Sequence, residues 1–190
     1  KNKFPKPSFV VIQSGTRVVE MRNVGSFDSD IRVKNELASE IQVPRMIEIC
    51  EKNGIWMKAH NTDYVSNEGL KSHPKLGIHA VNIAPEFGVI ETRALIEAFT
   101  HSAMYKERDD FLDMSYNSRK WEKWMVNDTK ASDFDRSVIS GHYVFSKKEC
   151  VELIDRLSFE LAKREINLHA YLREKVKQGI MRYVKNLNLA

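Results

Sequence analysis

Three short apolar runs, each followed by a cluster of polar residues, constrain the fold of this chain most strongly. They are Phe9–Thr16 (closed by Ser14-Gly15), Ile55–Ala59 and Ile78–Ile83. Short continuous apolar runs bounded by turn residues are typical of strands that are buried on both faces, as in parallel sheets. Each run is therefore predicted to contain one β-strand of a parallel sheet.

Helical segments separate and follow these runs. Val43–Lys52 places apolar residues on one face, and Pro44 suits the first turn of a helix. A shorter helix is predicted from an N-cap at Ser66 to a stop before Pro74, and a longer, well-buried helix over Val89–Tyr105. The alternation of strand and helix, repeated three times, favours parallel βαβ units.

The segment between the first run and the first helix is polar, charged and without a clear period. Val18–Ile41 is therefore predicted to be a long loop. Long loops inside compact domains are uncommon and often functional.

The last third of the chain has no strand pattern. A short helix is predicted in or beside Trp121–Trp124, and a longer one from the capping-box pattern Ser146–Glu149. Residues 111–190 are too large for a single barrel crossover, so they are predicted to be a helical cap on the βα units of residues 1–110. Its long helices are expected to carry Cys150, Ile154, Leu157 and Leu161, and then Leu172, Val176, Ile180 and Val184.

Chain length limits how much of a barrel these units can form. An eight-stranded barrel typically needs about 250 residues, and this chain has 190. The predicted fold is therefore α/β: the C-terminal portion of a (β/α)₈ TIM barrel, with three parallel βα units and an appended C-terminal helical cap. The N-terminal half of the barrel is expected to be missing here or supplied by another chain, because an open sheet would leave unpaired edges.

Composition narrows the expected setting of the protein. The net charge of +4 is mild, and no aromatic–basic interleaving suggests nucleic acid as a partner. No apolar run approaches the roughly 20 residues of a membrane span, and no leader-like segment precedes the first run. Cys50 and Cys150 are expected to be buried free thiols, which favours a cytoplasmic protein.

The first polar cluster is Gln13-Ser14-Gly15-Thr16, at the end of the first run. In βα barrels the active site lies on the loops that follow the strands. Gly15 allows a tight turn whose backbone N–H groups could bind a phosphate. Gln13, Ser14 and Gly15 are therefore predicted to bind substrate, and an ordinary strand-ending turn is the alternative.

The second cluster, His60-Asn61-Thr62-Asp63, follows the second run. A histidine that leaves a buried strand can bind a metal through one ring nitrogen, so His60 is predicted as a ligand of a divalent metal such as zinc. Asp63 could orient the histidine, share the metal or accept a proton, and Asn61 is predicted to bind substrate. A hydrogen-bonded structural histidine is the alternative, because a catalytic zinc usually has three protein ligands.

The third cluster runs from Asn82 to Gly88. Asn82 and Glu86 could bind sugar hydroxyls, and the helix N-terminus after Gly88 is a natural anion site. Glu86 is also a candidate for moving protons, although a carboxylate there could serve only the helix dipole. In the cap, Arg136 and His142 form a polar spot that could close over a ligand or simply pack.

These strand-end motifs resemble those of a known family. His60-Asn61-Thr62-Asp63-Tyr64 is similar to its histidine, small polar residue and Thr-Asp-Tyr, while Ile83-Ala84-Pro85 and Arg93-Ala94-Leu95 resemble its next strand end and helix. The family is the non-catalytic chain of class II D-tagatose-1,6-bisphosphate aldolase, also named tagatose-6-phosphate kinase. Further similarities lie at Phe9–Gln13, Trp121, Asp135-Arg136 and His142-Tyr143.

The resemblance implies a protein of carbohydrate metabolism that binds ketose phosphates and supports a catalytic aldolase subunit, or forms a homo-oligomer. More distantly, His60 and Asn82 look like the zinc-binding histidine and substrate-binding asparagine of class II ketose-bisphosphate aldolases. Gln13 departs from those enzymes, which are expected to carry a zinc-binding histidine on that strand. An intact three-histidine zinc site is therefore not implied.

Two alternatives stay open. The chain could itself be a metal-dependent ketose-phosphate 4-epimerase or aldolase, in which a metal held partly by His60 stabilises an enediolate while Asp63 or Glu86 moves protons. It could also be an inert structural fragment of a barrel.

Overall fold

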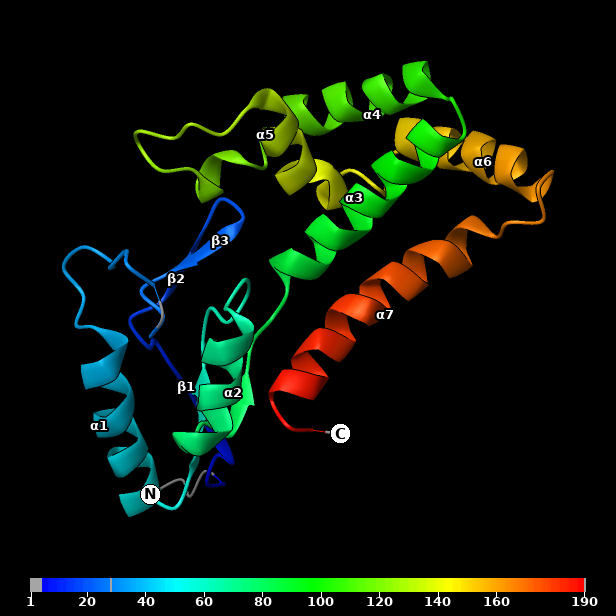
Figure 1. Ribbon diagram of the computed structural model, residues 1–190. Helices are drawn as coiled ribbons and strands as arrows, with labels where there is room; N and C mark the ends of the chain where they lie inside the picture. The colour runs from blue at the N-terminus through cyan, green and yellow to red at the C-terminus, as the bar shows by residue number, and fades with distance from the viewer. Residues whose placement is uncertain (1–4, 28, 190) are drawn as a thin grey trace. The chain divides into compact units, whose positions relative to one another are not determined.

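The protein is an α/β chain whose parallel sheet contains three strands. The computed structural model describes residues 5–27 and 29–189. Within them the chain divides into two compact units (Figure 1), one reaching Ile83 and resuming at Arg182, the other spanning Ala84–Met181. The predicted division at residue 110 stays a prediction.

The sheet of the first unit has the order β1-β4-β5, with all neighbours parallel. Its strands are β1 (Phe9–Ile12), β4 (Trp56–Ala59) and β5 (Ala80–Val81). The predicted strands therefore form, although β5 is shorter than Ile78–Ile83. In the register, Ile12 lies opposite Ala59, and Ala59 opposite Val81.

The two faces of this sheet have different surroundings. One face carries Met57 and Ala59 into a buried cluster with Val43 and Cys50 of α1 (Ser39–Lys52). Each large side chain buried here stabilises the unit by about 1.5–3 kcal/mol relative to exposure. The opposite face remains open among the described residues, where Phe9, Val11 and Trp56 are 41%, 53% and 54% exposed.

Helix α1 begins earlier than the sequence indicates. The predicted start at Val43 is wrong, because the helix begins at Ser39 and Pro44 lies inside it. The hydroxyl of Ser39 donates to the carbonyl oxygens of Ser14 (2.6 Å) and Gly25 (2.5 Å). Contacts with distant segments therefore fix the first residue of the helix.

The predicted loop Val18–Ile41 contains a β-hairpin, so that prediction is wrong in part; residue 28 lies outside the described residues. Strands β2 (Arg17–Val19) and β3 (Arg22–Val24) pair antiparallel. Their buried residues Val19 and Val24 form a small apolar cluster with Val33. Strands of three residues are too short to show the alternation by which a half-buried strand is recognised.

Helix α2 (Asn67–Lys75) follows β4 as predicted. The Ser66 side chain accepts a hydrogen bond from the Gly69 backbone N–H at 2.9 Å, which confirms the N-cap. The predicted stop before Pro74 is wrong, since the helix continues to Lys75.

The second unit is helical. Helix α3 (Pro85–His101) starts earlier than the predicted Val89 and ends before Tyr105, which instead begins a separate helix. In the described residues α3 is followed by four further α-helices (Figure 1): α4 (Tyr105–Asn117), α5 (Asp133–Ser140), α6 (Lys148–Ala162) and α7 (Leu168–Asn186). The last of them ends in the first unit.

Burial along α6 and α7 follows the predicted apolar positions in part. Cys150, Leu157 and Leu161 of α6 are buried as expected, and so is Leu172 of α7. Ile154, Val176 and Val184 are half-buried, and Ile180 is exposed. The predicted capping box at Ser146 is absent, since the N-cap of α6 is Lys147 and makes no side-chain bond. A capping box does form at the start of α5, between Ser132 and Asp135.

No helix in the described part of the chain is both long enough and apolar enough to cross a membrane.

Replacement of Gly25 tests how tightly the hairpin meets the end of β1. Gly25 has a φ of +82°, and a Cβ added there would collide with the carbonyl oxygen of Gly15. Gly77 has nearly the same φ, +83°, but a Cβ added there would lie 3.6 Å from its nearest neighbour, Ile47. Gly77→Ala should cost only the left-handed backbone penalty of about 1–2 kcal/mol. Gly25→Ala should lower the free energy of unfolding by about 3 kcal/mol or more.

Urea unfolding followed by circular dichroism measures both variants. Equal losses for Gly25→Ala and Gly77→Ala would contradict the close approach of Gly25 to Gly15.

Candidate functional site

Polar residues from neighbouring strands meet at the carboxyl edge of the sheet. The parallel register aligns Ile12, Ala59 and Val81, so the next residues, Gln13, His60 and Asn82, follow one another along this edge. The structure thus brings together one predicted residue from each polar cluster. Their roles in binding stay predictions.

Two carboxamides are held against each other at this edge. Gln13 Nε2 and Asn61 Nδ2 both donate to the carbonyl oxygen of Thr16, at 2.9 and 3.0 Å. Asn61 Nδ2 also lies 3.5 Å from Gln13 Oε1. Gln13 is exposed and Asn61 half-buried, so amide groups remain accessible from outside.

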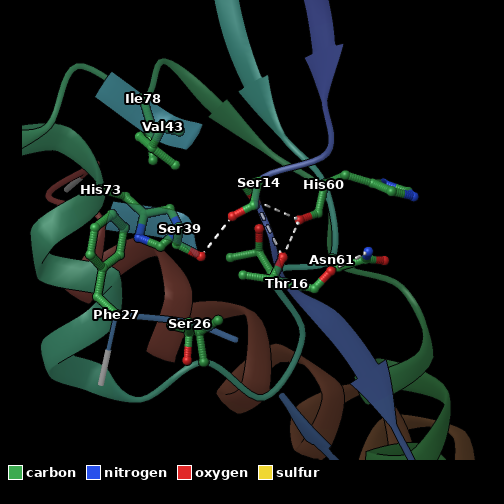
Figure 2. Close-up of a pocket in the computed structure, with 12 residues that line it drawn as sticks. Ser14, Thr16, Ser26, Phe27, Ser39, Val43, His60, Asn61, His73 and Ile78 are labelled. Carbon is green, nitrogen blue, oxygen red and sulfur yellow. Dashed lines mark hydrogen bonds between the residues drawn. The ribbon is translucent and has the colours of Figure 1, made fainter. Parts of the chain in front are cut away.

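Hydroxyl groups line a small cavity beneath the edge (Figure 2). Thr16 Oγ1 donates to the carbonyl oxygen of His60 at 3.1 Å, and Ser14 Oγ lies 3.5 Å from the same atom. Thr62 Oγ1, which also lines the cavity, has no hydrogen-bond partner among the described residues. The cavity has room for about one water molecule, so a sugar phosphate could contact only the outer edge.

The imidazole of His60 points away from this cavity, whereas its carbonyl oxygen points toward Ser14 and Thr16 (Figure 2). The ring is exposed, while Asp63 is buried. Within residues 5–27 and 29–189, no three His, Cys, Asp or Glu residues gather where they could hold a metal ion. His60 and Asp63 therefore do not make a three-ligand zinc site from this chain's described residues.

Ser14 and Gly15 are buried, so Gln13 is the exposed member of the first cluster. Asn82 connects the neighbouring segments through its backbone: its N–H donates to Ala59 and its carbonyl oxygen accepts from Thr62, both at 3.2 Å. Its side-chain Oδ1 is buried and has no hydrogen-bond partner in the part of the chain that the structure describes.

The residues that sequence reasoning missed come from outside the strand ends. Asn23, in the segment predicted as a loop, donates to the carbonyl oxygens of Asn61 and Asp63. Tyr183 of α7 contacts the same loop. No spacing in the sequence links these residues to the second cluster.

The other predicted site residues belong to the second unit. Glu86 is the second residue of α3 and is buried. Gly88, also on α3, faces His142, because an added Cβ would lie 2.5 Å from Cγ of the imidazole. Gly88 therefore provides the surface on which this ring packs.

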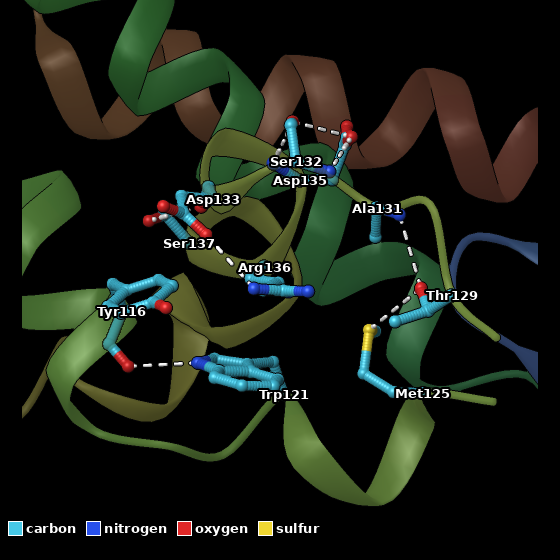
Figure 3. A network of polar contacts seen from close by, with 10 residues as sticks. All are labelled: Tyr116, Trp121, Met125, Thr129, Ala131, Ser132, Asp133, Asp135, Arg136 and Ser137. Carbon is cyan, nitrogen blue, oxygen red and sulfur yellow. Dashed lines mark hydrogen bonds and ion pairs between the residues drawn. The ribbon is translucent and has the colours of Figure 1, made fainter. Parts of the chain in front are cut away.

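Arg136 takes part in a network around α5 (Figure 3). Its Nη1 donates to Asp133 at 3.0 Å, and its guanidinium lies 4.9 Å from the ring centroid of Trp121. Trp121 Nε1 in turn donates to the carbonyl oxygen of Tyr116 at 2.9 Å. Arg136 thus connects α5 with the segment that carries Trp121, while its Nε is buried without a hydrogen-bond partner among the described residues.

His142 lies in an environment that disfavours its charged form. Burial, followed by the nearby Lys123 ammonium, lowers the pKa of His142 from its ordinary value of 6.5. The ring packs against Tyr143 with 4.0 Å between centroids. His142 is thus held largely neutral at pH 7.

Comparison with known proteins supports the fold. No model of a known protein family matches the sequence. A search of curated proteins gives no significant match. The crystal structure of a probable tagatose 6 phosphate kinase from Sinorhizobium meliloti 1021 matches 94% of this chain with a TM-score of 0.65 and 12% sequence identity. This chain spans about half of that one (52%), and at such low identity the similarity establishes the fold alone.

A double substitution tests the packing of His142 on Gly88. Gly88→Ala should destabilise the protein, because the added methyl displaces the imidazole. In a His142→Ala background the same change should stabilise it by about 0.5 kcal/mol, since alanine favours helix over glycine. Thermal unfolding of the four proteins measures both effects, and the same sign in both backgrounds would contradict the contact.

The pKa of His142 predicts a pH dependence. Its folded-state pKa is lower than the unfolded value of 6.5, so the unfolded chain binds more protons between the two values. Stability from this group should be complete above about pH 6.5 and decrease as the pH falls toward the folded pKa.

An NMR titration of the imidazole measures this pKa directly. Lys123→Met should raise it only part of the way to 6.5, because burial remains. A wild-type pKa at or above 6.5 would contradict the burial of the ring.

Proposed function

We propose that this chain forms the last three βα units of a (β/α)₈ barrel that binds ketose phosphates and supports a catalytic aldolase subunit. The observation that carries the proposal is the parallel register, which aligns Gln13, His60 and Asn82 along one edge of the sheet. Barrel proteins bind their substrates at this edge.

The open side of the sheet supports the barrel. Within the described residues β1 and β5 each pair with β4 alone, and the face that carries Phe9, Val11 and Trp56 lacks a covering layer. Natural proteins avoid unpaired strand edges and large bare apolar surfaces. Further parallel strands would cover both, and the similar tagatose 6 phosphate kinase chain is about twice as long.

The chemistry of the edge supports a sugar ligand. Carboxamides donate and accept hydrogen bonds at the same time, which matches sugar hydroxyls. Gln13 and Asn61 present such groups, and the name of the structural neighbour points to tagatose phosphate. The buried free thiols of Cys50 and Cys150 support a reducing compartment, as in the cytoplasm.

Catalysis by the chain itself is the second candidate, and the exposed His60 ring favours it. The ring lies free on the same edge, where residues of another strand could complete a metal site. A bound divalent metal would supply Lewis-acid polarisation of a ketose carbonyl. Asp63, in the same unit, would then be the proton-moving residue.

Calorimetric titration of the full-length protein with D-tagatose 6-phosphate, D-tagatose 1,6-bisphosphate and D-fructose 6-phosphate tests the binding role. Gln13→Ala should weaken affinity about five- to tenfold, the effect of one lost hydrogen-bonding group. Gln178→Ala is the matched control, because Gln178 is exposed on α7. The proposal is refuted if the protein binds none of the three sugar phosphates. It is also refuted if Gln13→Ala and the wild type bind them with equal affinity.

Metal content distinguishes the two candidates. Stoichiometric metal that is lost in His60→Ala, together with conversion of fructose 6-phosphate without a partner, would favour the enzyme. Activation of a separate aldolase chain without such metal would favour the supporting role.

A further inference from the structure

The loop that follows β4 has a backbone that needs support. Asn61 and Tyr64 both adopt left-handed conformations, with φ of 57° and 60°. Asparagine tolerates this region, but an aromatic residue rarely adopts it without stabilising contacts. Between them lie Thr62 and Asp63, both buried.

A single side chain from the hairpin spans this loop. Asn23 Nδ2 donates to the carbonyl oxygen of Asn61 at 2.7 Å and to that of Asp63 at 2.8 Å. Both amide hydrogens are thus used, across 38 and 40 residues of sequence. Because both partners are carbonyl oxygens, both bonds need donors, and the NH₂ group of asparagine supplies two of them from one atom.

The carbonyl between these two is also held from a distance. The hydroxyl of Tyr183 lies 3.4 Å from the carbonyl oxygen of Thr62 and accepts from the Tyr64 backbone N–H at 3.2 Å. Three successive carbonyl groups of the loop therefore accept hydrogen bonds from remote side chains. Asn23 supplies two of these bonds. One of them goes to Asn61, whose own side chain contacts Gln13 and Thr16.

We propose that Asn23 is a positioning residue for the candidate site. It fixes the loop of residues 60–65, and through it the carboxamide of Asn61 at the ligand-binding edge. This role rests on the proposed function. The β2–β3 hairpin then has a role in the site, because it places Asn23 next to the loop.

Asn23→Asp tests the role with an isosteric side chain that cannot donate and that opposes two carbonyl oxygens with a carboxylate. Hydrogen exchange of the Thr62 and Tyr64 amides should accelerate at least about tenfold, while the Met57 amide in β4 keeps its protection. Affinity for D-tagatose 6-phosphate should fall about tenfold, because the loop that carries Asn61 is then ordered in only about a tenth of the molecules. Asn127→Asp is the control, an equal change of charge at an exposed loop position.

Asn23→Ser is the second variant, in case the carboxylate prevents folding. Serine introduces no negative charge, but its shorter side chain has a single donor and cannot make both hydrogen bonds. Loop exchange and affinity should therefore change in the same direction as in Asn23→Asp. If hydrogen exchange of the loop amides is unchanged in either folded variant, Asn23 does not fix the loop, regardless of the affinity for the sugar phosphate. Accelerated exchange with unchanged sugar-phosphate affinity would overturn its part in binding, and a wild-type protein that binds no sugar phosphate would instead refute the proposed function.

Discussion

Hydrogen bonds between the segments that leave β1 and β4 are the constraint on which the candidate site depends. The Thr16 hydroxyl holds the carbonyl oxygen of His60, and the carboxamides of Gln13 and Asn61 hold that of Thr16. The bonds of Thr16 to His60 and of Asn61 to Thr16 join chain segments about 45 residues apart, whereas the Gln13 bond lies within the first segment. They also determine that His60 turns its carbonyl group, rather than its ring, toward the cavity.

The sequence predicts the sheet because its strands carry a strong physical signal. Each strand is an apolar run, and a polar residue follows the last paired residue of the strand at the edge of the sheet. The alignment of Gln13, His60 and Asn82 could therefore be predicted from the sequence alone. The direction of the His60 ring could not, because it depends on which atom Thr16 binds.

The hairpin and the helix starts were harder to predict for a different reason. The strands that contain Val19 and Val24 are stabilised by contact with Val33, and α1 begins where Ser39 meets Ser14 and Gly25. These are tertiary contacts, and local propensity does not contain them. In the second unit, the pattern at Ser146 forms no capping box, while Ser132 and Asp135 form one that was not expected. Asp135 is a shorter counterpart of the glutamate usual at that position.

The contact of Tyr183 with the loop after β4 has a consequence for synthesis of the protein. Tyr183 lies 119 residues beyond Tyr64. At about 5–20 residues per second, translation takes roughly 6 to 24 seconds to make that stretch. During that interval a nascent chain can build β1 and β4 but lacks the phenol that hydrogen-bonds to the loop between β4 and α2. The binding surface would thus mature later than the sheet that carries it.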